Sequence, residues 1–255
     1  MCVPYDSTPP IAPISGGAVA TRDLTLSSQD GTKFAAFFAG SGHPGSPAVV
    51  VLPDVRGLFK FYEELAVRFA ERGFDSVAFD FFGRTAGVAK RVADFPYMEH
   101  VPLTKAAQIT ADVRAAVSYL RQGKGNEKRP VFTVGFCFGG SNSWLQAASG
   151  HSLAGAVGFY GHPTRPGRDG SPSVVERVPE FKCPILGLMG GADQGIPAEE
   201  VAKFEATMTR AGVKHEVRMY PGAPHSFFDR RYEEFAKDSA DAWDRVLKFI
   251  AQNSK

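Results

Sequence analysis

Short apolar runs alternate with longer amphipathic stretches through most of the chain. The runs carry few charges and are apolar at nearly every position, which is typical of strands buried on both faces of a parallel sheet. They lie at residues 48–52, 76–79, 131–136, 155–160 and 184–189, and residues 215–220 form a further strand candidate. Strands separated by helices predict right-handed crossovers and a mostly parallel, doubly wound α/β sheet.

The amphipathic stretches predict the helices that connect these strands. Residues 103–122 repeat apolar side chains at a spacing of three and four, as in Ile109, Val113 and Leu120. A helix over 197–211 is marked by Pro197 in its first turn and by Gly212 after its end. Two further helices are expected, over residues 62–72 and 232–251.

The N-terminal part of the chain has a different pattern. Residues 1–20 are rich in Pro, Gly, Ala and Ser and predict an extended arm, followed by a single domain over residues 21–255. Leu24 and Leu26 alternate with polar neighbours, and Asp30-Gly31 predicts a tight turn before residues 33–39. We therefore expect an antiparallel pair at one edge of the sheet.

Two connections are unusually long, at residues 83–102 and 161–179. Loops of that length in a compact domain are usually functional or mobile.

Composition narrows the class of protein. The 255 residues are 44% hydrophobic and 22% charged, as in a globular protein with a substantial core. A net charge of +2 gives no reason to expect a nucleic-acid partner, and no apolar run approaches the about 18 residues of a membrane span. Three cysteines cannot all pair with one another, and the N-terminus lacks a secretory pattern. We expect a cytoplasmic protein, monomeric or a small homo-oligomer, with no metal site and no cofactor.

The segment from Gly135 to Gly139 carries the strongest chemical signal. An apolar strand runs into Gly-x-Cys-x-Gly and then a helical stretch, which is the context of a nucleophile elbow centred on Cys137. Glycines permit the tight reversal, and the N-terminus of the following helix favours a thiolate over a thiol. A small buried cysteine in a glycine-rich turn is the alternative interpretation.

Two downstream residues favour the elbow. Such a hydrolase needs an acid and then a histidine, each at the end of a later strand. Asp193 follows residues 184–189, and His225 follows residues 215–220. Asp193 could instead cap a helix, and His225 could be a surface turn residue. Because all three residues lie in turns at strand ends, we nevertheless favour a triad of Cys137, His225 and Asp193. His225, at the ordinary histidine pKa of about 6.5, would take the proton of the thiol.

The chain resembles the dienelactone hydrolase family of α/β-hydrolases from about Thr21 to the last helix. The cysteine in place of the usual serine is the most specific feature. The resemblance rests on the segments 53–57 (PDVRG), 79–84 (FDFFGR), 135–140 (GFCFGG), 158–161 (GFYG), 190–193 (GGAD) and 225–228 (HSFF). It implies an α/β-hydrolase fold, the triad above and a cytoplasmic hydrolase of small cyclic or activated carboxylic esters.

Further roles follow from the resemblance, with two departures. Asp54 stands where the family carries a glutamate that contacts the resting thiol. In the family, arginines hold a carboxylate of the substrate, and one of them shortly follows the histidine. Here Asp229 comes first and is followed by Arg230 and Arg231. The long connection at residues 83–102 offers Arg84 and Arg91 as further candidates.

The remaining site residues are expected around the nucleophile. The oxyanion should be bound by the N–H groups of Phe138 and Val55. Apolar side chains expected to line the pocket are Phe81, Phe82, Tyr160 and Phe227, although aromatic residues at these places could equally belong to the core. His162 is more readily explained as a loop residue, although it could border the pocket.

A cysteine nucleophile narrows the substrate, because a thiolate leaves more readily than an ordinary alkoxide or amine. Lactones with an enolate leaving group suit it, whereas peptides do not. Two rival hypotheses are kept: another small-ester, thioester or lactone hydrolase of the same family, and a non-catalytic ligand-binding member of the fold.

Overall fold

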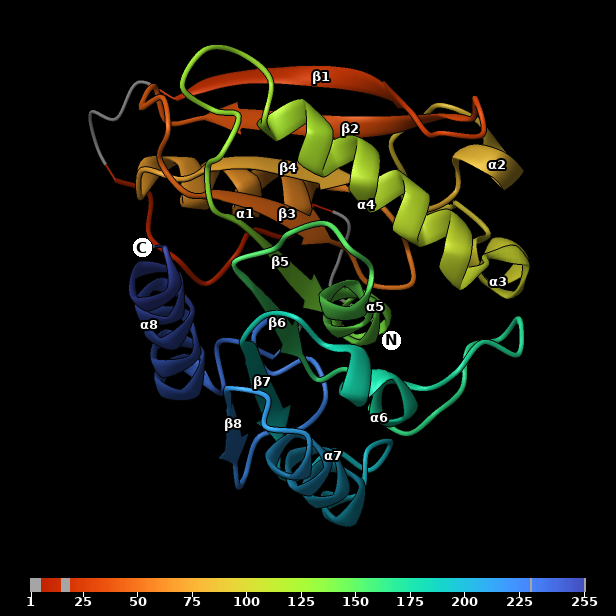
Figure 1. The fold of residues 1–255 in the computed structure, drawn as a ribbon, viewed down its shortest axis with the longest axis vertical. Helices are drawn as coiled ribbons and strands as arrows, with labels where there is room; N and C mark the ends of the chain where they lie inside the picture. The colour runs from red at the N-terminus through yellow and green to blue at the C-terminus, as the bar shows by residue number, and fades with distance from the viewer. Residues whose placement is uncertain (1–5, 15–18, 230, 255) are drawn as a thin grey trace.

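A single eight-stranded sheet organises the chain in a computed structural model, which describes residues 6–14, 19–229 and 231–254 (Figure 1). The strand order is β1-β2-β4-β3-β5-β6-β7-β8. β1 and β2 are antiparallel to their neighbours, whereas the strands from β4 to β8 pair in parallel. The predicted mostly parallel sheet with an antiparallel N-terminal edge is confirmed. The strands are β1 (Ala20–Ser27), β2 (Lys33–Gly40), β3 (Ala48–Leu52), β4 (Asp75–Phe79), β5 (Val131–Phe136), β6 (Gly155–Phe159), β7 (Ile185–Gly190) and β8 (His215–Tyr220).

The edge hairpin forms around the predicted turn. Ser27 pairs with Lys33, and Gly31 adopts a φ of 82° that a residue with a side chain rarely tolerates. The Thr32 N–H donates to Asp30 Oδ1 over 3.0 Å, which closes the turn.

Helices cover both faces of the sheet. α1 (Lys60–Glu71) and α8 (Ala236–Asn253) lie on one face, where the Phe69 and Trp243 rings meet with centroids 4.8 Å apart. α4 (Ala106–Leu120), α5 (Phe138–Leu145) and α7 (Ala198–Arg210) lie on the other, where Trp144 contacts Phe204 at the same separation (Figure 1).

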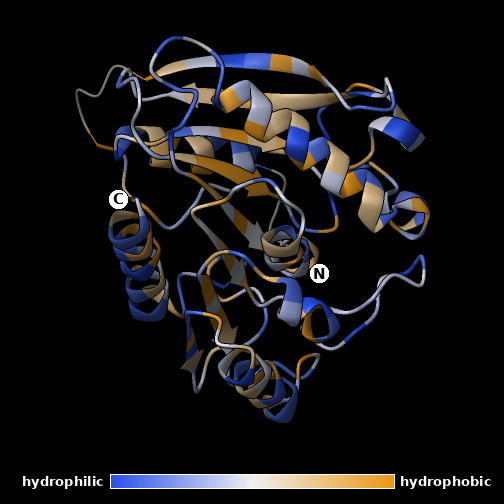
Figure 2. Ribbon diagram, in the orientation of Figure 1, coloured by the Kyte–Doolittle hydropathy of each residue, from blue (hydrophilic) through white to orange (hydrophobic). Residues whose placement is uncertain are grey.

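The core is divided by the sheet, because successive side chains of a strand point to opposite faces. Val49 and Val51 of β3 pack in the cluster that contains α1, whereas Val50 and Leu52 pack in the cluster that contains α4. Hydrophobic residues accordingly concentrate on the central strands (Figure 2).

Helix boundaries agree with the sequence pattern except at the C-terminus. α8 begins at Ala236 rather than at residue 232, because residues 232–235 form turns after the His225 loop. Within the predicted arm, Ile11 is buried against the core, and the Ile14 N–H donates to Glu71 Oε2 over 3.3 Å.

Both long connections contain short helices that the sequence pattern did not predict. Residues 83–102 include α2 (Gly83–Ala86) and α3 (Tyr97–His100), which leads into the 3-10 turn η1 (Val101–Leu103). Residues 161–179 include α6 (Val174–Arg177), which begins with a capping box between Ser173 and Glu176, and the start of η3 (Val178–Glu180). A further 3-10 turn, η2 (Gln146–Ala148), extends α5.

Within the described residues, no helix has both the length and the apolar character needed to cross a bilayer.

Candidate active site

Cys137 occupies a strained position between β5 and α5. Its φ of 54° and ψ of −114° lie outside the regions that side-chain-bearing residues prefer, which costs on the order of 1–3 kcal/mol. Backbone hydrogen bonds hold it there: the Cys137 N–H donates to Phe159 O over 3.0 Å, and Cys137 O accepts from the Gly140 N–H over 2.9 Å. The sulfur is half-buried and faces a cavity.

The glycines around Cys137 are required by close backbone contact. A Cβ on Gly135 would lie 2.0 Å from Gly139 O, and one on Gly139 would lie 2.2 Å from both Leu52 O and Pro53 O. No rearrangement of a side chain would relieve either clash, because the obstructing atoms belong to the backbone. The sequence therefore folds into an elbow that pushes Cys137 outward.

His225 and Asp193 meet next to this elbow. His225 Nδ1 lies 2.6 Å from Asp193 Oδ2, and the other carboxylate oxygen accepts from the Gly195 N–H over 2.8 Å. The Asp193 side chain is 3% exposed and that of His225 is 37% exposed. Asp193 is not a helix cap, because α7 begins after Pro197.

Cys137 and Asp193 both act on the imidazole of His225. Burial by itself lowers the pKa of His225, but the hydrogen bonds and negative charges of Asp193 and Cys137 outweigh it and raise the pKa to about 10. A pKa above the ordinary histidine value of about 6.5, which the sequence led us to expect, favours the protonated ring.

Tyr160 packs behind the histidine. Its ring centroid lies 4.9 Å from that of His225, and its hydroxyl donates to the buried Asp229 Oδ2 over 2.9 Å. Burial, with the Asp229 charge as a second cause, raises the pKa of Tyr160 well above its usual value, so the hydroxyl remains a donor.

A cavity of about 1120 Å³ opens at the sulfur. Residues from six regions border it: the turn after β3, the start of α4, the start of α5, the 161–179 connection, the loop after β7 and the His225 loop. Those that bear on the chemistry are Val55, Cys137, Phe138, Tyr160, His162, Arg165, Arg168, Asp169, Asp193, His225, Arg231 and Glu234.

Two backbone N–H groups are candidates for binding an oxyanion. Val55 and Phe138 both line the cavity, and in the described part of the chain neither N–H takes part in a hydrogen bond. Free N–H groups next to a nucleophile are suited to bind a developing oxyanion.

Comparison with known proteins identifies the family of the chain. The family model for the dienelactone hydrolase family matches residues 34–254. The chain belongs to that family.

Relatives of the chain within this family are found in several bacteria. A protein of Escherichia coli K12 named "Putative carboxymethylenebutenolidase" is 32% identical over 210 residues, or 81% of this chain and 77% of that protein. A "Probable 2-oxo-3-(5-oxofuran-2-ylidene)propanoate lactonase" of a Bradyrhizobium species is 28% identical and covers 80% of this chain and 83% of its own length. Membership makes the protein a carboxylic ester hydrolase, as the resemblance led us to expect.

Solved structures of the family share the fold. The crystal structure of a "Putative Dienelactone Hydrolase" from Klebsiella pneumoniae superposes with a TM-score of 0.81 at 25% identity, covering 92% of this chain and 99% of that one. The predicted α/β-hydrolase fold is confirmed.

Asp54 departs from the role that the family resemblance implied. Its two oxygens accept from Arg56, through Nε at 3.2 Å to each and Nη2 at 2.8 Å, and Oδ1 also accepts from the Arg56 N–H. Asp54 does not line the cavity of the sulfur. The expectation of a thiol-contacting carboxylate is thus corrected: a shorter side chain with an adjacent guanidinium pairs locally.

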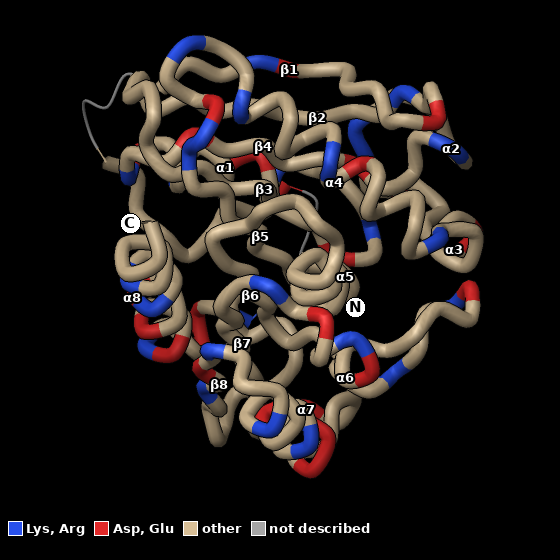
Figure 3. The backbone as a smooth tube through the Cα atoms, viewed as in Figure 1, with Lys and Arg blue, Asp and Glu red and all other residues tan. Residues whose placement is uncertain are grey.

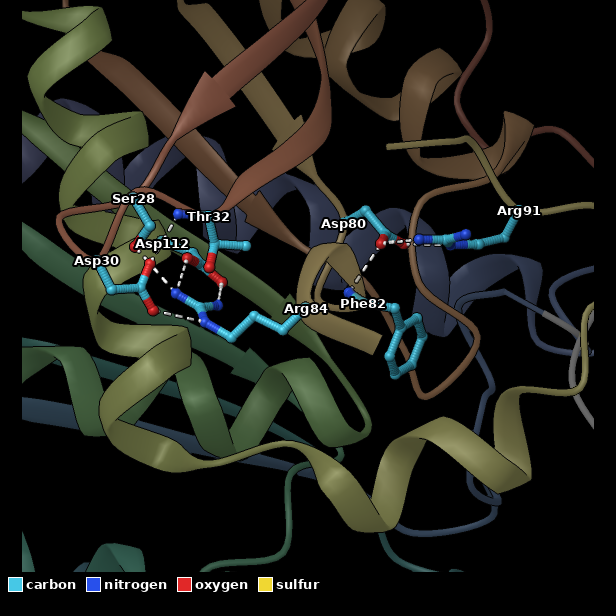
Figure 4. A network of polar contacts seen from close by, with 8 residues as sticks. All are labelled: Ser28, Asp30, Thr32, Asp80, Phe82, Arg84, Arg91 and Asp112. Carbon is cyan, nitrogen blue, oxygen red and sulfur yellow. Dashed lines mark hydrogen bonds and ion pairs between the residues drawn. The ribbon is translucent and has the colours of Figure 1, made fainter. Parts of the chain in front are cut away.

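The arginines of the 83–102 connection do not line the cavity either. Figure 4 shows both of them paired with carboxylates of the protein. Arg84 donates to both oxygens of Asp112, over 2.7 and 3.0 Å, and to Asp30 over 2.9 Å. Arg91 donates to Asp80 over 2.6 and 3.1 Å. The prediction that Arg84 binds substrate is corrected, because carboxylates of the protein already hold its guanidinium, and Arg91 is likewise occupied. Arg230 lies outside the described residues.

Three predicted pocket aromatics are core residues instead. Phe81 packs edge-on to Phe138, Phe82 packs against Phe95, and Phe227 packs against Tyr220; all three are buried and none lines the cavity. Only Tyr160 of this set does so. Apolar side chains near strand ends serve the core as readily as a pocket, so sequence could not separate them.

Sequence reasoning missed two arginines that do line the cavity. Arg165 and Arg168 lie on the 161–179 connection, which projects beside α6 and carries charges of both signs (Figure 3). His162 also lines the cavity, where its Nε2 lies 3.3 Å from Glu200 Oε2. Burial and then the Arg165 charge lower the pKa of His162. The signal available in the sequence was the length of this connection.

No group of three or more histidine, cysteine or acidic side chains suited to a metal ion occurs among the residues that the structure describes.

The close backbone packing of the elbow predicts that two Gly→Ala substitutions differ in their effect on stability. Gly139→Ala should destabilise the protein by about 1–3 kcal/mol or more, because its methyl group would overlap backbone oxygens. Gly222→Ala, with nothing within 4 Å of its added methyl group, should leave stability within about 0.5 kcal/mol. Urea unfolding of both variants checks this, and equal midpoints would show that the elbow tolerates a side chain.

Proposed function

We propose that the protein hydrolyses small cyclic or activated carboxylic esters through a thioester on Cys137. The observation that carries this proposal is that Cys137 and the hydrogen-bonded pair His225 and Asp193 line one cavity. Val55 and Phe138 line the same cavity, and among the described residues their N–H groups have no partner. The groups required for acyl transfer therefore lie within one cavity.

Acylation begins with the proton already on the imidazole. Cys137 Sγ attacks the ester carbonyl, and the resulting oxyanion accepts from the N–H groups of Val55 and Phe138. As the intermediate collapses, the carbon–oxygen bond breaks and His225 gives its proton to the leaving oxygen. Asp193 holds the ring in position through Nδ1.

Deacylation uses the same ring in the opposite direction. Once the sulfur is acylated it carries no negative charge, so one cause of the raised His225 pKa disappears. The neutral ring takes a proton from water as the water oxygen attacks the thioester. The carbon–sulfur bond then breaks, and the thiolate and protonated imidazole are restored.

Charge in the cavity favours a substrate with an anionic group. The lining carboxylates have partners: Asp193 holds His225, Glu234 pairs with Arg231, and Asp169 accepts from the N–H groups of Ala106 and Ser171. Within the described residues, Arg165 and Arg168 form no ion pair. We assign the substrate's anionic group to these two arginines, on the connection after β6.

The thiol mechanism predicts loss of activity in one cysteine variant only. Cys137→Ala should reduce turnover of a chromogenic phenyl ester by about 10⁴-fold or more, as removal of a triad member does in other hydrolases. Cys183→Ala should keep it, because Cys183 is buried against the core. One equivalent of iodoacetamide should inactivate the wild type. Equal turnover in all samples would refute a thiol nucleophile, and no turnover on a panel of lactones and aryl esters would favour a ligand-binding protein.

The raised pKa of His225 predicts its titration. The ring should lose its proton at about pH 10 in the wild type, and at lower pH in Asp193→Asn and in Cys137→Ala, since each removes a negative partner. The imidazolium therefore persists below pH 10 and is lost above it. NMR of the ring nitrogens measures this, with Asp169→Asn as a control that alters a different lining carboxylate. A wild-type midpoint near 6.5, the ordinary value, would contradict the proposed resting state.

The anionic subsite predicts selective effects on binding. Arg165→Gln and Arg168→Gln should each raise KM for a carboxylate-bearing aryl ester by about tenfold, the size of one charged hydrogen bond. KM for the neutral methyl-ester analogue should stay unchanged. Arg231→Gln is the matched control, since Glu234 already holds that guanidinium. Equal effects on both substrates would contradict an electrostatic role.

A further inference from the structure

The turn between β3 and α1 carries Val55 to the cavity. Val55 is half-buried and lines the cavity, whereas its neighbours Asp54, Arg56, Gly57 and Leu58 are buried. A short, irregular segment thus presents one residue to the site, and the rest of the segment lies inside the protein.

The first support of this turn is internal. Asp54 O accepts from the Gly57 N–H over 3.1 Å, and Asp54 Oδ1 accepts from the Arg56 N–H over 2.8 Å. The Arg56 guanidinium holds both oxygens of Asp54 and lies 4.1 Å from the centroid of the Phe59 ring. The backbone that follows Val55 is therefore bound to Asp54, through its carboxylate at Arg56 and through its carbonyl at Gly57.

The second support comes from β4 and the 83–102 connection. Asp80 Oδ1 accepts from the Leu58 N–H over 3.1 Å, and Arg91 holds the Asp80 carboxylate through Nε and Nη2 (Figure 4). The Arg91 N–H donates to Leu58 O over 2.7 Å. Arg91 thus restrains Leu58 from both sides, at its carbonyl directly and at its N–H through Asp80.

Contact between the turn and Asp80 is close. Gly57 has a φ of 80°, and a Cβ there would lie 2.3 Å from Asp80 Oδ1. The carboxylate therefore lies against the backbone of the turn, and a change in its position would be transmitted to residues 54–58.

We propose that the buried Asp80–Arg91 and Asp54–Arg56 pairs are positioning residues that hold the Val55 N–H at the oxyanion. This inference rests on the proposed function, because only an acyl-transfer reaction forms that oxyanion. Neither arginine touches the cavity, so neither binds substrate.

Ion pairs are suited to this turn because the hydrogen bonds of a carboxylate have fixed directions. Burying a charged pair adds little stability compared with apolar side chains of similar size. A carboxylate, however, accepts several hydrogen bonds at fixed angles, so it determines where the Arg56 and Leu58 N–H groups lie. An oxyanion donor must lie within a few tenths of an ångström of its position, since hydrogen-bond strength falls steeply with distance and angle.

Arg91→Met tests the proposal, and Arg84→Met is its matched control. Both arginines come from the same connection, both hold an aspartate through two nitrogens, and only Arg91 contacts the turn. Two rates are compared in each variant: turnover of the phenyl ester, and alkylation of Cys137 by iodoacetamide followed on its peptide by mass spectrometry. Alkylation displaces iodide from a tetrahedral carbon and forms no oxyanion, so it reports the sulfur alone.

The expected result is a fall in the ratio of turnover to alkylation. Arg91→Met should lower it about 10- to 100-fold, less than the about 10²- to 10³-fold that follows complete loss of an oxyanion donor. KM should change little, and amide hydrogen exchange in residues 53–59 should become faster. Arg84→Met should keep the ratio within about twofold, because stability lost at Asp112 does not move the turn.

Several outcomes would overturn the inference. An unchanged ratio in Arg91→Met, or equal falls in both variants, would show that the pair has only a structural role. If Arg91→Met does not fold, Arg91→Lys keeps the charge with fewer contacts and should lower the ratio by a smaller factor; an unaltered ratio there has the same meaning. Absence of turnover in the wild type would refute the proposed function itself, and this inference with it.

Discussion

Backbone packed directly on backbone is the constraint on which the site depends. The first turn of α5 lies against the end of β3, close enough that Gly139 has no room for a side chain beside Leu52 O and Pro53 O. Cys137 precedes Gly139, and Val55 follows Pro53. This contact therefore places the strained turn of Cys137 next to the segment that carries Val55, whose own position also depends on the hydrogen bonds of Asp54 and Asp80.

Some charged side chains near this contact are held in ion pairs, and others are not. Asp54 and Asp80 are held by arginines inside the protein, and Asp193 is held by His225. These pairs fix the position of backbone or of the imidazole, and they leave no net charge to attract a ligand. The positive charge that we propose for substrate binding comes instead from the connection after β6, whose arginines line the cavity without an ion pair among the described residues.

Sequence could predict the parts of the site that depend on chain order. The apolar runs located the strands, and each strand end in turn located Cys137, Asp193 and His225, because parallel strands deliver their carboxyl ends to one edge. It could not tell which arginine reaches the cavity. A long side chain can pair with any carboxylate within its reach, and whether Asp112 or Asp80 lies there depends on tertiary packing. Sequence could not separate pocket aromatics from core aromatics for a similar reason. Phe82 and Tyr160 both have large apolar rings, and tertiary packing alone determines which of them lines the cavity.

In the proposed mechanism, a sulfur nucleophile beside a protonated imidazole limits which esters can react. In the tetrahedral intermediate the thiolate and the substrate oxygen compete to leave, and the thiolate is the better leaving group against an ordinary alkoxide. The imidazolium of His225 offsets this by delivering a proton to the substrate oxygen, but it holds that proton tightly while the sulfur is negative. Forward collapse is therefore favoured when the leaving oxygen is stable as an anion, as in an enol or phenol ester. An anionic group held by Arg165 and Arg168 would add orientation, because it fixes which of the two carbon–heteroatom bonds faces the imidazolium.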